Sequence, residues 1–178
     1  MSETIGIVQL GPTLDCSIEK LRDKVARKFP GFQVRMLEAV DTTPMAFDSF
    51  RNQYHSTRIL VLLEEKLHAV ATRRLLGVAA FDLFVPGMNF VFGEARCPGR
   101  VAVISTYRLK ADDSDGPDLF EGRVVKEAVH EIGHMLGLKH CSSPSCVMHF
   151  SERLADTDRK EDGFCSECEP RMKWLEVE

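Results

Sequence analysis

The stretch HEIGHMLGLKHC, residues 130–141, places three histidines, one glutamate and one cysteine within twelve positions. His130 and His134 are four residues apart, so on a helix their side chains lie side by side and can converge on one Zn²⁺ at about 2.0 to 2.1 Å from each nitrogen. Glu131 would border the same cavity, set back from the metal, and could hold a proton while the metal polarises water. This spacing indicates metal-assisted hydrolysis, although HExxH also occurs by chance on the solvated face of an ordinary helix.

The residues after this helix favour a metal site over a solvated face. Gly137 falls where the helix should end, and a glycine in the left-handed region can reverse the chain within a residue or two. That reversal would return His140 as a third ligand. Three neutral imidazoles leave one tetrahedral position open, which distinguishes a catalytic zinc from a structural one. Met148 follows at the spacing of a methionine turn beneath the metal, although a methionine is more commonly core filler.

Four cysteines suggest a second metal site. Cys141 and Cys146 form a C-x4-C pair, and Cys165 and Cys168 form a C-x2-C pair. Four thiolates at such spacing suit a tetrahedral structural zinc that is closed to water. A redox motif is the alternative, but it needs only one pair and leaves the other unexplained. Because Cys141 directly follows His140, the structural site should fix the turn that presents the third histidine.

The two other cysteines, Cys16 and Cys97, have no such partners in the sequence. Both are expected to be buried or half-buried thiols without a chemical role.

The motif needs a helix and a sheet to position it. On a helix over residues 123–136, the two helical histidines lie opposite an apolar stripe, which would pack on the core and consists of Val125, Ala128, Val129, Ile132 and Leu136. A strand, a helix and a strand are predicted over residues 4–10, 15–29 and 32–37, which is a βαβ unit and favours a largely parallel sheet. The pattern further predicts a helix at 57–70, strands starting at 73 and 100, a short edge strand at 89–93 and a solvated acidic loop at 111–122.

Length and charge restrict the class of protein. A chain of 178 residues favours a single domain, and a formal net charge of −4 gives no general attraction to nucleic acid. The sequence contains no run of about 18 apolar residues, so no membrane span is predicted. The first residues read as a strand rather than a signal peptide, and the cysteines as thiols or metal ligands, so a cytoplasmic location is expected.

Together these motifs resemble the archaemetzincin family, metzincin-like zinc metalloproteases with an added four-cysteine zinc site. The resemblance rests on the catalytic motif and on the methionine and four cysteines that follow it: His130, Glu131, His134, Gly137, His140, Cys141, Cys146, Met148, Cys165 and Cys168. It implies one compact α/β catalytic domain over residues 1–178, with a twisted, mixed, mainly parallel sheet. An antiparallel edge strand, matched by residues 89–93, would lie above the cleft. An active-site helix and a C-terminal helix complete the fold, with residues 141–178 as a zinc-clamped subregion.

The resemblance also implies two zinc ions per chain, one catalytic and one structural. Some metzincins carry a tyrosine two residues after the turn methionine, where Phe150 stands here. Electrophilic assistance would then come from elsewhere, with His149, Tyr54 or Arg51 as weak candidates, since each is more commonly a structural or solvated residue.

The leading hypothesis is a monomeric zinc metallopeptidase that hydrolyses small peptides, with Glu131 as general base and acid. An aminopeptidase activity is expected from the resemblance alone. The alternative is a zinc-stabilised peptide- or protein-binding protein with a weak or inactive peptidase site. A zinc-ribbon nucleic-acid module is disfavoured by the acidic balance and by the lack of a Lys/Arg stripe near Cys165.

Overall fold

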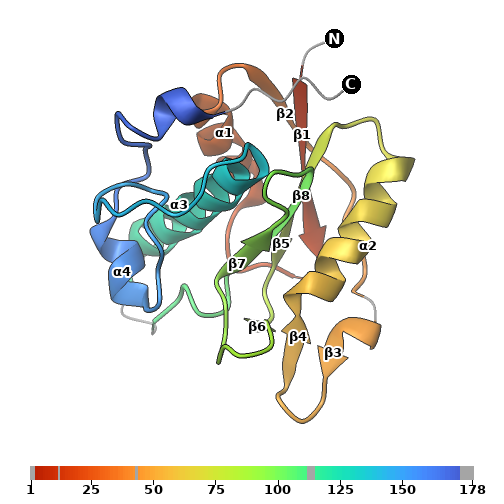
Figure 1. Cartoon of the computed structure of the whole chain (residues 1–178). Coiled ribbons are helices and arrows are strands. Elements are labelled where there is room, and N and C mark those ends of the chain that lie inside the picture. Colours follow the sequence, from red (N-terminus) through yellow and green to blue (C-terminus); the bar gives the residue numbers. More distant parts are fainter. Residues whose placement is uncertain (1–2, 12, 43, 112–114, 173–178) are drawn as a thin grey trace.

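The computed structural model describes residues 3–11, 13–42, 44–111 and 115–172. The larger of its two sheets has five strands. Its strand order is β2-β1-β5-β8-β7 (Figure 1). The first four strands of this order are parallel, whereas β7 runs antiparallel to β8 at the edge. Their bounds are β1 Glu3–Leu10, β2 Phe32–Met36, β5 Arg74–Ala79, β7 Gly93–Ala95 and β8 Val101–Ser105. The predicted mixed, mainly parallel sheet with an antiparallel edge strand is confirmed.

Helices cover both faces of this sheet (Figure 1). α1 (Ile18–Lys28) and α3 (Pro117–Met135) pack on one face, and α2 (Ser56–Ala69) packs on the other. β8 shows why, because Ala102 and Ile104 join the core under α1 and α3 while Val101 and Val103 join the core under α2. A strand that is apolar on both faces requires cover on both sides.

A second, smaller sheet was not predicted. It consists of β3 (Phe47–Asp48), β4 (Gln53–His55) and β6 (Leu83–Phe84), and the 3₁₀ turn η1 (Pro44–Ala46) precedes it. Strands of two or three residues are too short to show an alternating pattern. The tight turn between β3 and β4 places Asn52 at a positive φ of 54°, and asparagine tolerates this region better than most residues.

Two predicted boundaries were wrong. The edge strand begins at Gly93, and the predicted strand 89–93 is mostly a loop in which Val91 makes an isolated bridge to Leu83. α3 begins at Pro117 rather than at residue 123, so the second half of the predicted loop 111–122 is helical. Pro117 in the first turn and Asp118 beside it are start signals that explain the earlier start. Residues 112–114 of that loop lie outside the described residues.

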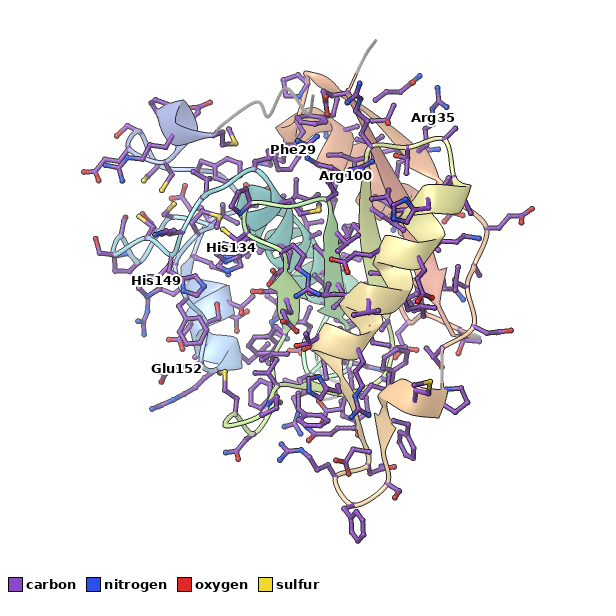
Figure 2. All side chains as sticks on the ribbon, turned by 45° about the vertical axis from the view of Figure 1, so that its right-hand side comes forward. Phe29, Arg35, Arg100, His134, His149 and Glu152 are labelled. Atoms are coloured by element: carbon purple, nitrogen blue, oxygen red, sulfur yellow. The ribbon has the colours of Figure 1, made fainter. Side chains whose placement is uncertain are left out.

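The chain after α3 wraps back along that helix. It contains the short α4 (Leu154–Arg159) and ends among the described residues with the 3₁₀ turn η2 (Glu169–Arg171). His134, His149 and Glu152 lie on the same side of the molecule, by α3 and these C-terminal segments (Figure 2). The part of the predicted C-terminal subregion beyond residue 172 lies outside the described residues. A search of the described residues finds no helix of the length and apolar character that a membrane span requires.

Candidate active site and metal centres

Three histidines converge at the C-terminal end of α3. His130, His134 and His140 each offer a ring nitrogen, and these atoms lie within 4.8 Å of one another. The Nε2 atoms of His130 and His134 are 3.1 Å apart. Two Zn–N bonds of about 2.0 to 2.1 Å at a tetrahedral angle would place the nitrogens roughly 3.3 Å apart. The three side chains therefore fit a tetrahedral zinc ion with one position left open.

The rings of the two helical histidines are oriented by backbone carbonyls. His130 Nδ1 lies 2.7 Å from the Val147 carbonyl oxygen, and His134 Nδ1 lies 2.7 Å from that of Leu138. A carbonyl only accepts, so each Nδ1 carries the hydrogen and each Nε2 keeps a free lone pair. Burial also lowers the pKa of the His130 and His134 imidazoles, and it lowers the pKa of His140 to about 4. All three rings are thus held in the neutral form that binds a metal.

A glycine turn returns the third histidine to the other two. Gly137 has a φ of +89°, its N–H donates to the His134 carbonyl at 2.9 Å, and the Leu138 N–H donates to that of Gly133 at 3.0 Å. These two bonds form a Schellman motif, which ends a helix and reverses the chain. The reversal places the His140 ring 4.9 Å from the His134 ring, measured between centroids.

Met148 packs directly beneath the histidine-bearing turn of α3. Its side chain is fully buried. A Cβ atom added at Gly133 would lie only 2.5 Å from the Met148 sulfur and 3.1 Å from Phe164. Glycine at position 133 therefore lets the methionine and the helix approach closely.

This close approach gives the first testable prediction. Gly133→Ala should destabilise the protein by about 1 to 3 kcal/mol, because the added methyl group overpacks the contact with Met148. Gly122→Ala is the matched control on the same helix, since a Cβ there meets nothing within 4 Å. That control should gain about 0.4 to 1 kcal/mol. Thermal unfolding of the zinc-loaded proteins measures both, and a Gly133→Ala variant as stable as Gly122→Ala would contradict the packing described.

Glu131 is buried against the edge strand. Only 4% of its side chain is exposed, and a Cβ at Gly93 of β7 would lie 2.6 Å from its Oε1 atom. Its Oε2 atom is buried and has no hydrogen-bond partner among the described residues. Burial, followed by the charges of Glu127 and Glu94, raises the pKa of this carboxyl well above its ordinary value. A carboxylate with a raised pKa is the better proton acceptor. Because His130 and Glu131 are both buried, the interpretation of the motif as the solvated face of an ordinary helix is wrong.

A cleft of about 570 Å³ runs past these residues. Its walls are the loop from Val85 to Phe92, strand β7, the histidine face of α3 and the segment from Phe150 to Glu152. The edge strand and the active-site helix thus face one another across the cleft.

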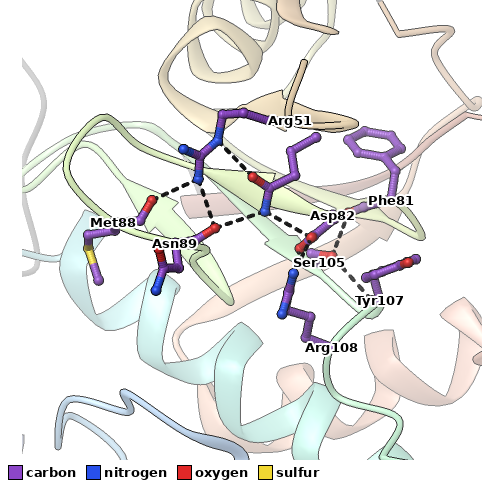
Figure 3. A network of polar contacts seen from close by, with 9 residues as sticks. Arg51, Phe81, Asp82, Met88, Asn89, Ser105, Tyr107 and Arg108 are labelled. Atoms are coloured by element: carbon purple, nitrogen blue, oxygen red, sulfur yellow. Dashed lines mark hydrogen bonds and ion pairs between the residues drawn. The ribbon is translucent and has the colours of Figure 1, made fainter. Parts of the chain in front are cut away.

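The loop wall is held from behind by a polar network (Figure 3). Arg51 donates to the carbonyls of Met88 and Asn89 at 3.0 and 2.9 Å. Arg108 binds both carboxylate oxygens of Asp82, at 2.7 and 2.6 Å, and its guanidinium lies over the Phe90 ring. The loop is thereby fixed to the turn between β3 and β4 and to the segment after β8.

The three candidates for electrophilic assistance do not line the cleft. Arg51 is occupied by the loop carbonyls, Tyr54 packs against Phe81 with ring centroids 4.1 Å apart, and His149 Nδ1 lies 2.9 Å from the Cys141 carbonyl oxygen. These contacts are structural. Phe150, at the place of the metzincin tyrosine, contacts the His140 ring with centroids 4.9 Å apart.

The four cysteines predicted as a second site also come together. The sulfur atoms of Cys141, Cys146, Cys165 and Cys168 lie within 4.8 Å of one another. Cys141 and Cys165 are separated by 3.8 Å between sulfurs. Two Zn–S bonds of about 2.3 Å at a tetrahedral angle give roughly the same separation. Backbone N–H groups of Cys168 and Glu167 lower the pKa of the Cys165 thiol to about 7, which favours the thiolate that zinc binds.

The two remaining cysteines differ from each other. Cys16 is half-buried, and burial raises the pKa of its thiol to about 11. Cys97 is exposed and lines the cleft, where its sulfur donates to the Leu138 carbonyl at 3.3 Å. The expected burial holds for Cys16 and is wrong for Cys97, and the absence of a chemical role stays a prediction for both.

A buried ion pair behind the cleft was missed. Lys160 is fully buried, and its Nζ atom lies 2.9 Å from Oε1 of Glu127, which also accepts from the Thr157 hydroxyl at 3.0 Å. Glu127 lines the cleft one helical turn before Glu131. Charged residues are mostly exposed, so nothing in the sequence marked these two as partners.

Comparison with known proteins agrees with this geometry. The model of peptidase family M54 matches residues 13–174. An archaemetzincin from Archaeoglobus fulgidus is 44% identical over 158 residues, which cover 89% of this chain and 92% of the relative. The crystal structure of an archaemetzincin from Methanopyrus kandleri superposes with a TM-score of 0.84 at 35% identity, covering 96% of this chain and 93% of that one. A zinc-dependent peptidase from Methanocorpusculum labreanum has a TM-score of 0.81 at 25% identity, with 95% and 100% covered.

Proposed function

Because this chain belongs to peptidase family M54 and is a zinc metalloprotease, we propose that it hydrolyses small peptides as an aminopeptidase in the cleft beside α3. The catalytic zinc would be held by His130, His134 and His140, whose ring nitrogens converge. The proposal rests on the Nε2 atoms of His130 and His134, which lie 3.1 Å apart. Each keeps a free lone pair, because a backbone carbonyl accepts the hydrogen of Nδ1. The buried carboxyl of Glu131 is the adjacent residue of the same helix.

Zinc, when bound, supplies a Lewis acid that polarises water and the scissile carbonyl. The protein's own contribution is proton transfer by Glu131. Its Oε2 atom, buried and without a partner, accepts the proton of the attacking water and later delivers it to the leaving amine. The close contact with Gly93 keeps this carboxyl beside the edge strand, where an extended peptide can pair with the free side of β7.

We also propose a second zinc ion, held by Cys141, Cys146, Cys165 and Cys168 and closed to water. The 3.8 Å separation of the Cys141 and Cys165 sulfurs supports it. Adjacent His140 and Cys141 join the two sites through one peptide bond, so the structural ion would stiffen the turn that presents the third histidine. A single domain with a zinc-clamped subregion at 141–178, a monomeric state and a cytoplasmic location stay predictions.

A peptide-library digest tests the function. Zinc-loaded protein should release the first residue of short peptides with a free amino terminus and leave Nα-acetylated copies intact. Mass spectrometry identifies the products. Cleavage of the acetylated copies would contradict the aminopeptidase assignment alone. Two bound zinc ions without cleavage of any peptide would contradict the peptidase proposal and favour the alternative of a zinc-stabilised binding protein.

A further inference from the structure

The charged side chains that line the cleft are all of one sign. Apart from the histidines, they are Glu94, Glu127, Glu131 and Glu152, and no lysine or arginine lines the cleft among the described residues. A wall of one sign raises the local concentration of the opposite charge and repels like charge. The cleft therefore discriminates between peptides by charge as well as by shape.

These carboxylates are only partly balanced. Glu127 is neutralised by Lys160. Glu94 accepts from the Ser56 and Thr57 hydroxyls at the start of α2, and these are neutral groups. Glu152 is exposed and forms no ion pair within the part of the chain that the structure describes. Glu94 and Glu152 therefore line the cleft without an ion pair among the described residues.

The cations Arg51, Arg108 and Lys139 do not line the cleft. Arg51 and Arg108 hold the back of the loop wall through carbonyls and Asp82. The positive charge of Lys139 interacts with the Cys97 thiol, which lies by the Leu138 carbonyl just beyond the C-terminal end of α3. Glu127 lies near the middle of α3, seven residues before His134 and so about 10 Å away along the helix axis.

Ser151 and Glu152 also border the cleft. Phe150, just before them, contacts the His140 ring. The chain then enters α4, whose Thr157 binds Glu127. We name Glu127, Ser151 and Glu152 the acidic end of the cleft. The Ser151 hydroxyl oxygen is buried and has no partner among the described residues, so the acidic end holds an unused acceptor beside two carboxylates.

We propose that the acidic end of the cleft binds a positively charged group of the peptide, an ammonium or a guanidinium, next to the bond that is cut. This inference rests on the proposed peptidase function and adds the charge of its substrate. Two sources carry such a group: the free amino terminus and the side chain of lysine or arginine. Phe150, 38% exposed beside the acidic end, offers an apolar surface on which the methylene stem of a basic side chain can lie.

Binding measurements on a variant that does not cut the peptide test this charge preference separately from turnover. Zinc-loaded Glu131→Gln protein is titrated calorimetrically with amidated alanine hexapeptides. One has a free amino terminus, one is acetylated, and acetylated sets carry a single arginine, citrulline or glutamate at each position. Charge-assisted hydrogen bonds should make the free-amine or the arginine peptides bind about tenfold tighter than the acetylated alanine and citrulline peptides. Tighter binding of the free-amine peptide indicates that the amino terminus is the group bound. Tighter binding of the arginine peptides indicates that the side chain is.

Substitutions at the rim assign the effect to the acidic end. Because Glu152 is exposed and contributes only its backbone N–H to Asp156, Glu152→Gln should fold normally and lose most of the preference. Glu152→Lys should favour the glutamate peptides instead. Glu65→Gln, an exposed carboxylate on α2 away from the cleft, should leave the preference unchanged.

Several results would overturn the proposal: equal affinity for all peptides, tighter binding of the glutamate set, no binding of any peptide, or an unchanged preference in Glu152→Lys. The proposed function fails separately. Wild-type protein that cleaves without regard to charge contradicts only the charge preference, whereas cation-selective binding without cleavage contradicts only the peptidase.

Discussion

Replacing Glu131 with glutamine is expected to reduce peptidase turnover by about 10²- to 10⁴-fold while the zinc content stays the same. Glutamine preserves the shape of the side chain but cannot accept the proton of the attacking water. The carboxyl is set back from the three histidines and packs against Gly93 of the edge strand, so the metal ligands are not disturbed. Initial rates on a cleaved peptide, together with metal analysis of the same samples, measure the two quantities.

The fold of this variant should be intact. The carboxyl is 4% exposed and its pKa is raised by burial, so a neutral amide removes the cost of a buried charge. We expect a thermal midpoint at or above that of the wild type. Glu65→Gln, at an exposed position on α2, should keep full turnover. Full turnover in Glu131→Gln would show that another group transfers the proton.

The second large effect is expected at the four-cysteine cluster. Cys168→Ser should remove one zinc ion per chain and destabilise the protein by more than about 4 kcal/mol, because loss of a structural metal is among the most damaging single changes. Cys168 is 6% exposed and belongs to the core cluster beneath α3. The affinity of the remaining site for zinc should also fall, because Cys141 adjoins His140.

Zinc content, thermal unfolding and zinc affinity at the histidine site measure these three consequences. Cys16→Ser is the matched control, since Cys16 packs against the same core cluster but lies outside the group of four. It should keep both ions. An unchanged zinc content in Cys168→Ser would mean that the four cysteines do not form a metal site.

The sequence predicts best those residues whose spacing along the chain fixes their relative position in space. Two histidines four positions apart lie on one face of a helix, and a glycine three residues later ends that helix by a Schellman motif with Gly137 at a φ of +89°. The apolar stripe of the active-site helix is buried as predicted, because its period matches the helix. The parallel sheet followed from the βαβ unit at the start of the chain.

What the sequence could not predict depends on contacts between distant residues. Lys160 and Glu127 are 33 positions apart, and neither carries a sign that the other will be its buried partner. The edge strand has three residues, one of them a glycine required by the approach of Glu131 rather than by strand propensity. Arg51 suggested catalysis by its charge, but its position behind the loop wall makes it structural.

One chain is expected to hold two zinc ions, one at the histidines and one at the cysteines. Zinc-edge anomalous diffraction from crystals of the zinc-loaded protein tests it most directly. We predict two peaks, one about 2.0 to 2.1 Å from ring nitrogens of His130, His134 and His140, and one about 2.3 Å from the four sulfurs. A single peak, or a peak bound by any other set of residues, would contradict the account.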